Sequence, residues 1–151
     1  MKRKLYITIL GLLSTIMMAA VPYCDVRKFS ITDGLAANTI SDLKQGRDNL
    51  MWFSTWNGLS FYDGYSFHTF RDNPDDIDIL STNRILQIEP SYNNNVWCIT
   101  YDHQLYVYDT HFCQFFAVGQ KFNELFNIDL RVSQVYPLKN GATWFTSEDG
   151  K

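Results

Sequence analysis

The stretch Asp48-Asn49-Leu50-Met51-Trp52-Phe53-Ser54-Thr55 returns about every 45 residues along this chain of 151 residues. Its second copy reads Asn94-Asn95-Val96-Trp97-Cys98-Ile99-Thr100, and its third reads Asn140-Gly141-Ala142-Thr143-Trp144-Phe145-Thr146-Ser147. Each copy places a tryptophan among apolar or β-branched residues, directly after residues that favour a turn. The pattern predicts that one short strand recurs at the same position of a repeated unit.

Segments on both sides of this stretch repeat in the same register. Leu35, Asn38 and Ile40 return 45 residues later as Leu80, Asn83 and Ile85, and Tyr62-Asp63 returns 46 residues later as Tyr108-Asp109. A third copy opens at Val132-Ser133-Gln134-Val135 and reaches the end of the chain before its second half. A period of roughly 40 to 50 residues built from short aromatic and β-branched runs is typical of propeller blades.

The runs within each unit predict an all-β fold of four-stranded antiparallel meanders, because four short apolar runs alternate with turn residues. A helical turn is plausible only at 122–128. The expected division is a signal peptide over 1–20, a lead-in over 21–38 with a lone strand at 29–32, a first blade over 39–71, an inter-blade loop over 72–83, a second blade over 84–118, an inter-blade link over 119–131 and a partial third blade over 132–151.

About two and a half blades cannot form a closed propeller, which needs roughly four to eight. A blade buries its faces only against neighbouring blades, so two and a half blades leave faces that further blades would have to cover. The chain is therefore expected to be either the beginning of a longer protein or a truncated product.

The first residues predict an N-terminal signal helix that directs export. A basic start, Met1-Lys2-Arg3-Lys4, precedes an apolar run from Leu5 to Val21 that ends in small residues, Ala19-Ala20. An uncleaved signal anchor is the alternative, because Met18 occupies a position where the cleaving enzyme prefers a small side chain. The run is short for a membrane span of about 20 residues and Pro22 follows it, which favours cleavage.

The part beyond residue 20 is acidic. It holds all 16 acidic residues, whereas three of the 13 basic residues lie in the signal segment. Nucleic acid is an unsuitable partner for such a surface.

The cysteines, Cys24, Cys98 and Cys113, are odd in number, so at least one thiol is unpaired in an exported protein. Cys98 is expected on the second strand of its blade and Cys113 on the fourth. Two strand spacings are roughly 9.5 Å, too far for a disulfide. We therefore expect free, buried thiols, and no Cys-x-x-Cys or His-x-x-x-His spacing predicts a metal site.

Aromatic residues make up 16% of the chain and recur at fixed positions of the repeat. Trp52, Trp97 and Trp144 share one position, and Tyr62 and Tyr108 share another. Because a blade core needs a large side chain in every blade, repetition favours packing over ligand contact. The aspartates that follow the two tyrosines are expected to accept hydrogen bonds from nearby backbone N–H groups.

The motif that begins Asp33-Gly34-Leu35-Ala36-Ala37-Asn38-Thr39-Ile40 and continues through residues 48–55 to Gly58-Leu59-Ser60-Phe61-Tyr62-Asp63 resembles the two-component regulator propeller repeat. The resemblance covers residues 29–151. It departs from the family pattern at Ser54 and Ile99, which replace the usual glycine, and in the opening of the third unit.

This resemblance implies the N-terminal, periplasmic part of a hybrid two-component sensor, which combines a histidine kinase with a response regulator. Such a sensor binds a small molecule or oligosaccharide, often a product of polysaccharide breakdown, on the periplasmic side of the inner membrane. The remaining blades and the signalling domains would lie in cis, and the intact sensor is expected to be a homodimer. No kinase, receiver or DNA-binding motif occurs in this sequence, so no catalysis is expected of this segment.

The candidate ligand-binding residues are Trp56, Asn57, Asp102 and His103. Alternation of strand direction places the turn after the second strand on the same end of each blade as the inter-blade loops. Trp56 stands where the second copy carries Asp102, so it is expected not to be a repeat position. An exposed indole there would stack on a sugar face while the amide of Asn57 reads hydroxyl groups. The alternative is an indole that folds back on its own blade.

The sequence predicts no catalytic residue, cofactor or metal ion. The acidic stretch from Asp72 to Asp78 lacks the glycine and the bidentate glutamate of a calcium loop. The three histidines share no ligand spacing, and no carboxylate pair for glycoside hydrolysis is defined. Two rival functions stay open: an exported propeller enzyme acting on polysaccharide, and a plain interaction scaffold.

Overall fold

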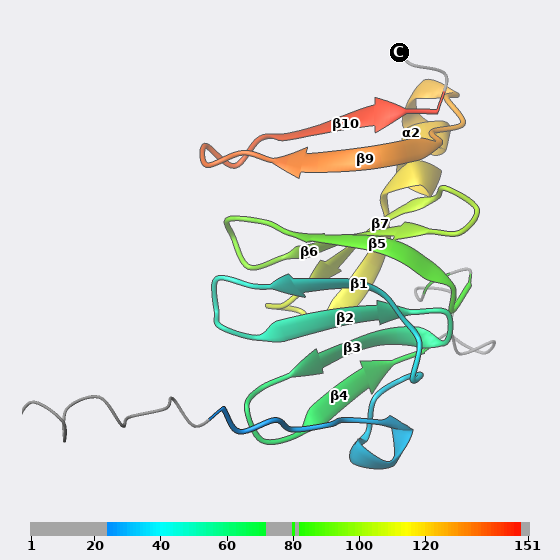
Figure 1. The fold of residues 1–151 in the computed structure, drawn as a ribbon. Coiled ribbons are helices and arrows are strands. Elements are labelled where there is room, and N and C mark those ends of the chain that lie inside the picture. The colour runs from blue at the N-terminus through cyan, green and yellow to red at the C-terminus, as the bar shows by residue number, and fades with distance from the viewer. Residues whose placement is uncertain (1–23, 72–79, 81, 149–151) are drawn as a thin grey trace, which may run out of the picture.

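The computed structural model describes residues 24–71, 80 and 82–148. They form two four-stranded sheets and a two-stranded hairpin, which lie in layers in chain order (Figure 1). Every strand pair among them is antiparallel, so the predicted all-β fold is confirmed. The predicted signal peptide over 1–20 and the acidic stretch from Asp72 to Asp78 lie outside the described residues.

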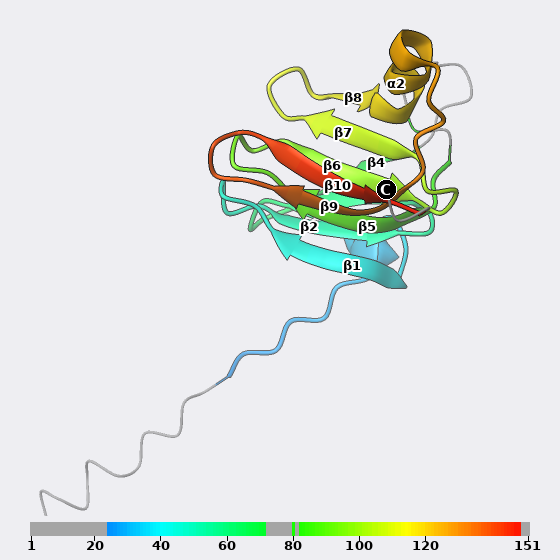
Figure 2. The ribbon, with the colours of Figure 1, turned by 90° about the horizontal axis from the view of Figure 1, so that it is seen from above.

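The strands follow one another through each sheet as a simple meander. The first sheet contains β1 (Ile40–Gln45), β2 (Met51–Thr55), β3 (Gly58–Tyr62) and β4 (Phe67–Phe70). The second contains β5 (Ile85–Pro90), β6 (Val96–Thr100), β7 (Leu105–Asp109) and β8 (Gln114–Ala117). The hairpin contains β9 (Val132–Pro137) and β10 (Thr143–Ser147), and it overlies β5 and β6 (Figure 2).

The turns between the first and second strands of the three units share one backbone geometry. Asn49, Asn94 and Gly141 occupy the equivalent place, with φ of 65°, 68° and 86°. The left-handed region favours glycine and tolerates asparagine, which is why these residue types stand there. In each turn the positive-φ residue donates its N–H to the carbonyl three residues earlier, at 3.1 to 3.3 Å. The sequence period is therefore also a structural period.

Successive sheets are joined along their first strands, β1 and β5, which lie side by side. Asp42 of β1 accepts a hydrogen bond from the backbone N–H of Ile88 at 3.1 Å. Lys44 of the same strand pairs with Glu89 at 3.0 Å. The hydrogen bond to Glu89 raises the pKa of Lys44. Polar contacts thus fix the register between two sheets whose facing surfaces are otherwise apolar.

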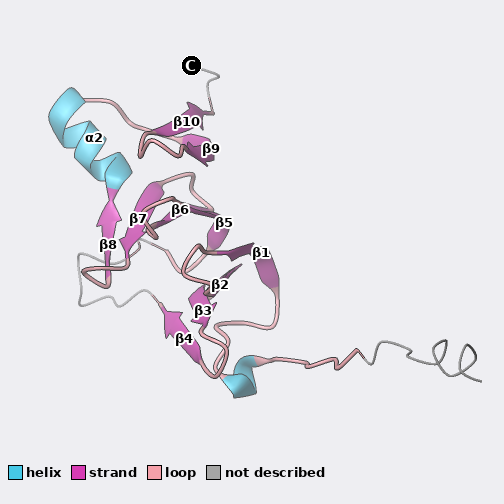
Figure 3. Cartoon of the chain, turned by 90° about the vertical axis from the view of Figure 1, so that its left-hand side faces the viewer, coloured by secondary structure: helices cyan, strands magenta, loops and turns pink. Residues whose placement is uncertain are grey.

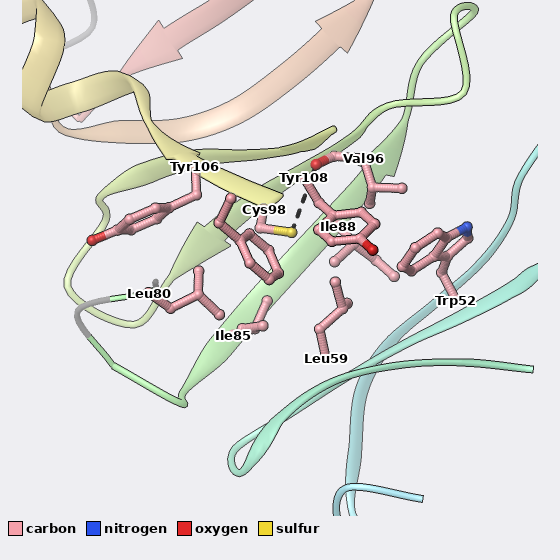
Figure 4. Packing of buried hydrophobic residues seen from close by; sticks show 10 residues of the cluster. Trp52, Leu59, Leu80, Ile85, Ile88, Val96, Cys98, Tyr106 and Tyr108 are labelled. Carbon is pink, nitrogen blue, oxygen red and sulfur yellow. Dashed lines mark hydrogen bonds between the residues drawn. The ribbon is translucent and has the colours of Figure 1, made fainter. Parts of the chain in front are cut away.

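The main core lies between the first and second sheets (Figure 4). Trp52 and Leu59 come from the first sheet, and the second supplies a larger set: Leu80, which precedes β5, and Ile85, Ile88, Val96, Cys98, Tyr106, Tyr108 and Phe115. The ring of Trp52 lies 5.6 Å from that of Tyr108 across the interface. Burial of this apolar surface is what holds the two meanders together.

The three equivalent tryptophans differ in burial because each faces the next unit of the chain. Trp52 is 1% exposed beneath the complete second sheet. Trp97 is partly buried, since the unit that follows it contributes only the two strands of the hairpin to the cluster against which it packs. Trp144 faces no described unit and is 67% exposed. The prediction that all three are core residues is therefore confirmed for Trp52 and wrong for Trp144.

The lone strand predicted at 29–32 is wrong. Ile31–Asp33 forms a single 3-10 turn (η1), because a capping box is stronger here than the apolar and polar alternation. The Asp33 carboxylate accepts the N–H of Ser30 at 2.8 Å, and Gly34 ends the turn with φ of 104°. The lead-in then crosses the outer face of the first sheet, where the Thr69 hydroxyl donates to the Gly34 carbonyl at 2.7 Å.

A nine-residue helix, α2 (Val118–Phe126), links the second sheet to the hairpin (Figure 3). It begins four residues before the helical turn predicted from sequence, and its Gly119 lies close to the side chain of Gln104, just before β7. Phe122 lies 5.9 Å from Phe145 of the hairpin, measured between ring centroids. Among the described residues, no helix combines the length and apolar character that a membrane span requires.

The three cysteines are free, as predicted, but only one is buried. Cys98 lies in the core, and burial raises the pKa of its thiol. Cys24 and Cys113 are exposed. The prediction of a buried thiol at Cys113 is wrong because this residue stands in the turn before β8, with φ of 53°, and not on the strand.

The aspartates at the ends of β3 and β7 have the local role that the sequence predicts. The Asp63 carboxylate accepts the backbone N–H groups of Tyr65 and Ser66, both at 2.8 Å. Asp109 makes the equivalent bonds in the second sheet, at 2.8 and 3.1 Å. The hydrogen bonds from Ser66 and Tyr65 lower the pKa of Asp63 to about 2, because they stabilise the charged carboxylate.

Candidate functional site

The predicted binding residues come together at the end of the sheets where β2 and β10 finish, on the right of Figure 1. The turn between β2 and β3 carries Trp56 and Asn57, and the turn between β6 and β7 carries Asp102 and His103. These turns are adjacent, since the rings of Trp56 and Tyr101 lie 5.8 Å apart. Glu148, just after β10, reaches His103 at 3.2 Å.

Trp56 is exposed at this end, with 53% of its surface open to solvent. Tyr101, which the sequence reasoning missed, lies beside it and is 55% exposed. The sequence reasoning placed Asp102 opposite Trp56 and concluded that the tryptophan is not a repeat position. The structure corrects this, because β2 and β6 end at equivalent residues and Trp56 and Tyr101 directly follow them, 45 residues apart. The same period that aligns Trp52 with Trp97 gives this pair.

Arg84 lies against both rings and was also missed. Its guanidinium carbon is 5.5 Å from the centroid of Trp56 and 5.9 Å from that of Tyr101. The backbone of Arg84 is fixed, because its carbonyl accepts the N–H of Tyr101 at 2.9 Å and its N–H donates to the Thr82 hydroxyl at 3.2 Å. We refer to Trp56, Arg84 and Tyr101 as the arginine–aromatic cluster.

Asn57 connects the lead-in to the first sheet. The side-chain amide of Asn57 donates to the carbonyl of Ala36 at 3.2 Å. The backbone carbonyl of Asn57 accepts a hydrogen bond from Nε of Arg71, also at 3.2 Å. Arg71 also bonds the Ala36 carbonyl at 3.2 Å. One N–H of the Asn57 amide is therefore used within the protein.

Asp102 and His103 hold the turn and join it to the third unit. The Thr100 hydroxyl donates to the carboxylate of Asp102 at 2.6 Å, and Arg131 bonds the Asp102 carbonyl at 2.8 Å. His103 adopts the left-handed backbone conformation, with φ of 62°. Its ring contacts the carbonyl of Val132 at 3.3 Å as well as Glu148. The half-buried imidazole thus bridges the second sheet and the hairpin.

The arginines at this end differ in how their side chains are engaged. Arg71 bonds two backbone carbonyls, and Arg131 bonds a carbonyl and, at 3.3 Å, the carboxylate of Asp129. Within the described part of the chain, the guanidinium of Arg84 contacts aromatic rings and no carboxylate. The cluster therefore offers two apolar ring surfaces and an exposed cation with open N–H donors.

No group of three or more metal-ligating side chains occurs among residues 24–71, 80 and 82–148. The pair of His103 and Glu148 has no third ligand among them.

Comparisons with known proteins connect this fold to signalling. No family model matches the chain. A segment of 55 residues, 36% of the chain, is 33% identical to histidine kinase P4 of Formosa agariphila. The fold resembles that of a solved structure described as the extracellular domain of the hybrid two component system BT3049 from B. thetaiotaomicron, with a TM-score of 0.57, 24% identity and 80% of this chain covered.

The matched parts are small fractions of those proteins, 4% of the kinase and 16% of the solved chain. Both matches are nevertheless to two-component signalling proteins. The resemblance predicted from the repeats is therefore confirmed, and the fold is similar to part of that extracellular domain.

Proposed function

We propose that the two meanders and the hairpin are consecutive blades of a propeller, about two and a half in number. The first blade spans 39–71, the second 84–118 and the partial third 132–151, joined by the loop 72–83 and the link 119–131 and preceded by the lead-in 21–38. Burial decreases from Trp52 through Trp97 to Trp144, which supports this proposal, because each tryptophan is covered by as much of the following sheet as is present. A ring of such sheets buries every equivalent position.

The chain then acts as the N-terminal part of the extracytoplasmic sensing region of a hybrid two-component sensor. The two signalling relatives support this assignment. The signal peptide over 1–20 directs export to the periplasmic side of the inner membrane. The remaining blades and the signalling domains lie in cis, the intact sensor is a homodimer, and this segment performs no catalysis.

The ligand is a carbohydrate breakdown product, and it binds at the end that carries Trp56 and Tyr101. The observation that carries this proposal is two adjacent aromatic side chains, each more than half exposed, at the tips of equivalent turns. Sugar rings present flat C–H faces that stack on such side chains, and nearby polar groups then select the hydroxyl pattern. Asn57, Asp102 and His103 stand beside the two rings as those polar groups.

Calorimetric titration with a panel of neutral and acidic oligosaccharides tests this proposal. At least one member should bind the 151-residue chain, and Trp56→Ala should weaken that binding at least tenfold. Trp144→Ala is the matched control, because it also removes an exposed indole but lies on the hairpin, away from the turns. An unchanged affinity in Trp56→Ala would place the site elsewhere. Shortened products after incubation would favour the exported enzyme instead.

A further inference from the structure

Packing within the protein does not account for the position of the Arg84 side chain. Its guanidinium is exposed and is held over Trp56 and Tyr101. A guanidinium within cation–π range of two rings, here 5.5 and 5.9 Å from their centroids, meets no hydrogen-bond acceptor in those rings that would use up its N–H donors. Those donors have the spacing that binds a carboxylate or a sulfate through two parallel hydrogen bonds.

Among the residues that the structure describes, no acidic group occupies these donors. Asp102 accepts from the Thr100 hydroxyl, Asp129 pairs with Arg131, and Glu148 pairs with His103. Each carboxylate on the described part of this end therefore has a partner other than Arg84. An acidic protein repels anions over most of its surface, so a cation with no acidic partner among the described residues, beside two rings, is a favourable place for an anion.

We propose that the ligand carries a negative charge, and that Arg84 binds its carboxylate or sulfate while Trp56 and Tyr101 stack on the sugar rings beside it. This inference rests on the proposed carbohydrate-sensing function and narrows it to acidic oligosaccharides. Uronic acids and sulfated sugars share the required chemistry: an anionic group attached to a ring with an apolar face. Arg84 is then the residue that determines specificity.

The fixed backbone of Arg84 favours such a role. Hydrogen bonds to Tyr101 and Thr82 hold its position, and the two rings limit the freedom of its side chain. Less conformational entropy is then lost when the anion binds. A lysine at this position keeps the charge but loses the paired N–H donors of the planar guanidinium.

The test compares trigalacturonate with its trimethyl ester, which keeps the sugar skeleton and removes the charge. Calorimetry should show the ester binding about 10- to 100-fold more weakly, the range expected for hydrogen bonds to a charged group. Arg84→Gln should weaken trigalacturonate by a similar factor and leave the ester unchanged. Raised salt should reduce the difference between the two ligands.

Arg47→Gln is the matched control. Arg47 also lies over an aromatic ring, that of Tyr92 at 3.9 Å, but in the turn between β1 and β2. The variant removes the same charge and the same kind of contact away from the cluster. It should leave the affinity for trigalacturonate within about twofold, the expected effect of a distant surface charge.

Each further result decides one point. A sulfated disaccharide that binds while trigalacturonate does not would identify sulfate as the anion and keep the role of Arg84. Equal binding of acid and ester would overturn the anionic inference and leave carbohydrate sensing intact. Equal binding of a triglutamate peptide would overturn the sugar assignment. Failure of every saccharide, neutral members included, would overturn the proposed function as well.

Discussion

Trp52→Ala should lower the free energy of unfolding by about 3 to 5 kcal/mol. The side chain is 1% exposed, and its ring lies 5.0 Å from that of Phe61 and 5.6 Å from that of Tyr108, between centroids. Truncation therefore leaves a cavity between the two sheets that the rigid strands cannot close. Trp144→Ala should change stability by less than about 0.5 kcal/mol, since the indole is mostly exposed.

Two further substitutions, Trp97→Ala and Trp52→Phe, are expected to give intermediate losses of stability. Trp97→Ala should fall between the two extremes, because its ring is only partly covered. The indole N–H of Trp52 has no acceptor among the described residues. Trp52→Phe removes this unsatisfied donor together with part of the volume, so it should cost less than Trp52→Ala.

Urea unfolding followed by circular dichroism measures these differences. The midpoints should rank Trp144→Ala above Trp97→Ala, and Trp97→Ala above Trp52→Ala, with similar slopes. Equal losses at Trp52 and Trp144 would refute the argument that each tryptophan is buried by the following sheet. So would a ranking in the opposite order.

Three further outcomes follow from local geometry. Gly58→Ala should destabilise the protein more than Gly64→Ala in urea unfolding, because both residues have positive φ but only at Gly58 would the new Cβ overlap the Phe70 carbonyl oxygen; equal losses would contradict this. A thiol reagent should modify two cysteines in the folded chain and a third, Cys98, only after unfolding, since burial raises its pKa and blocks access; three fast-reacting thiols would show an open core. The pKa of Asp63 is lowered, so its carboxylate stabilises the turn above the usual value of 3.8 and that contribution is lost as pH falls towards 2; an NMR titration midpoint at 3.8 would disprove the turn's hydrogen bonds.

Much of the fold could be predicted from sequence because its causes are local. Turn residues such as Asn49 and Asn94 take a backbone conformation that few other residues accept. Asp63 and Asp109 bond backbone groups within three residues of themselves. Such short-range preferences repeat whenever the sequence repeats, so the 45-residue period was enough to place eight strands in two meanders.

The lead-in shows where local reasoning fails even at short range. Alternation at 29–32 favours a strand, but the side chains of Ser30 and Asp33 satisfy the backbone of a tight turn. A strand needs a partner, and in this part of the chain η1 is instead held by its own cap and by the first sheet.

The sequence by itself determined the repeat, the strand class, the turns and the end of the sheets at which Trp56, Asn57, Asp102 and His103 gather. Only the tertiary structure decided which of the equivalent tryptophans is buried, because burial depends on what the next sheet covers. It also brought the guanidinium carbon of Arg84 within 5.9 Å of the ring centroids of both Trp56 and Tyr101, which follow strands of two different sheets. Contacts between sheets arise from how the sheets pack against one another, and no spacing along one strand encodes them.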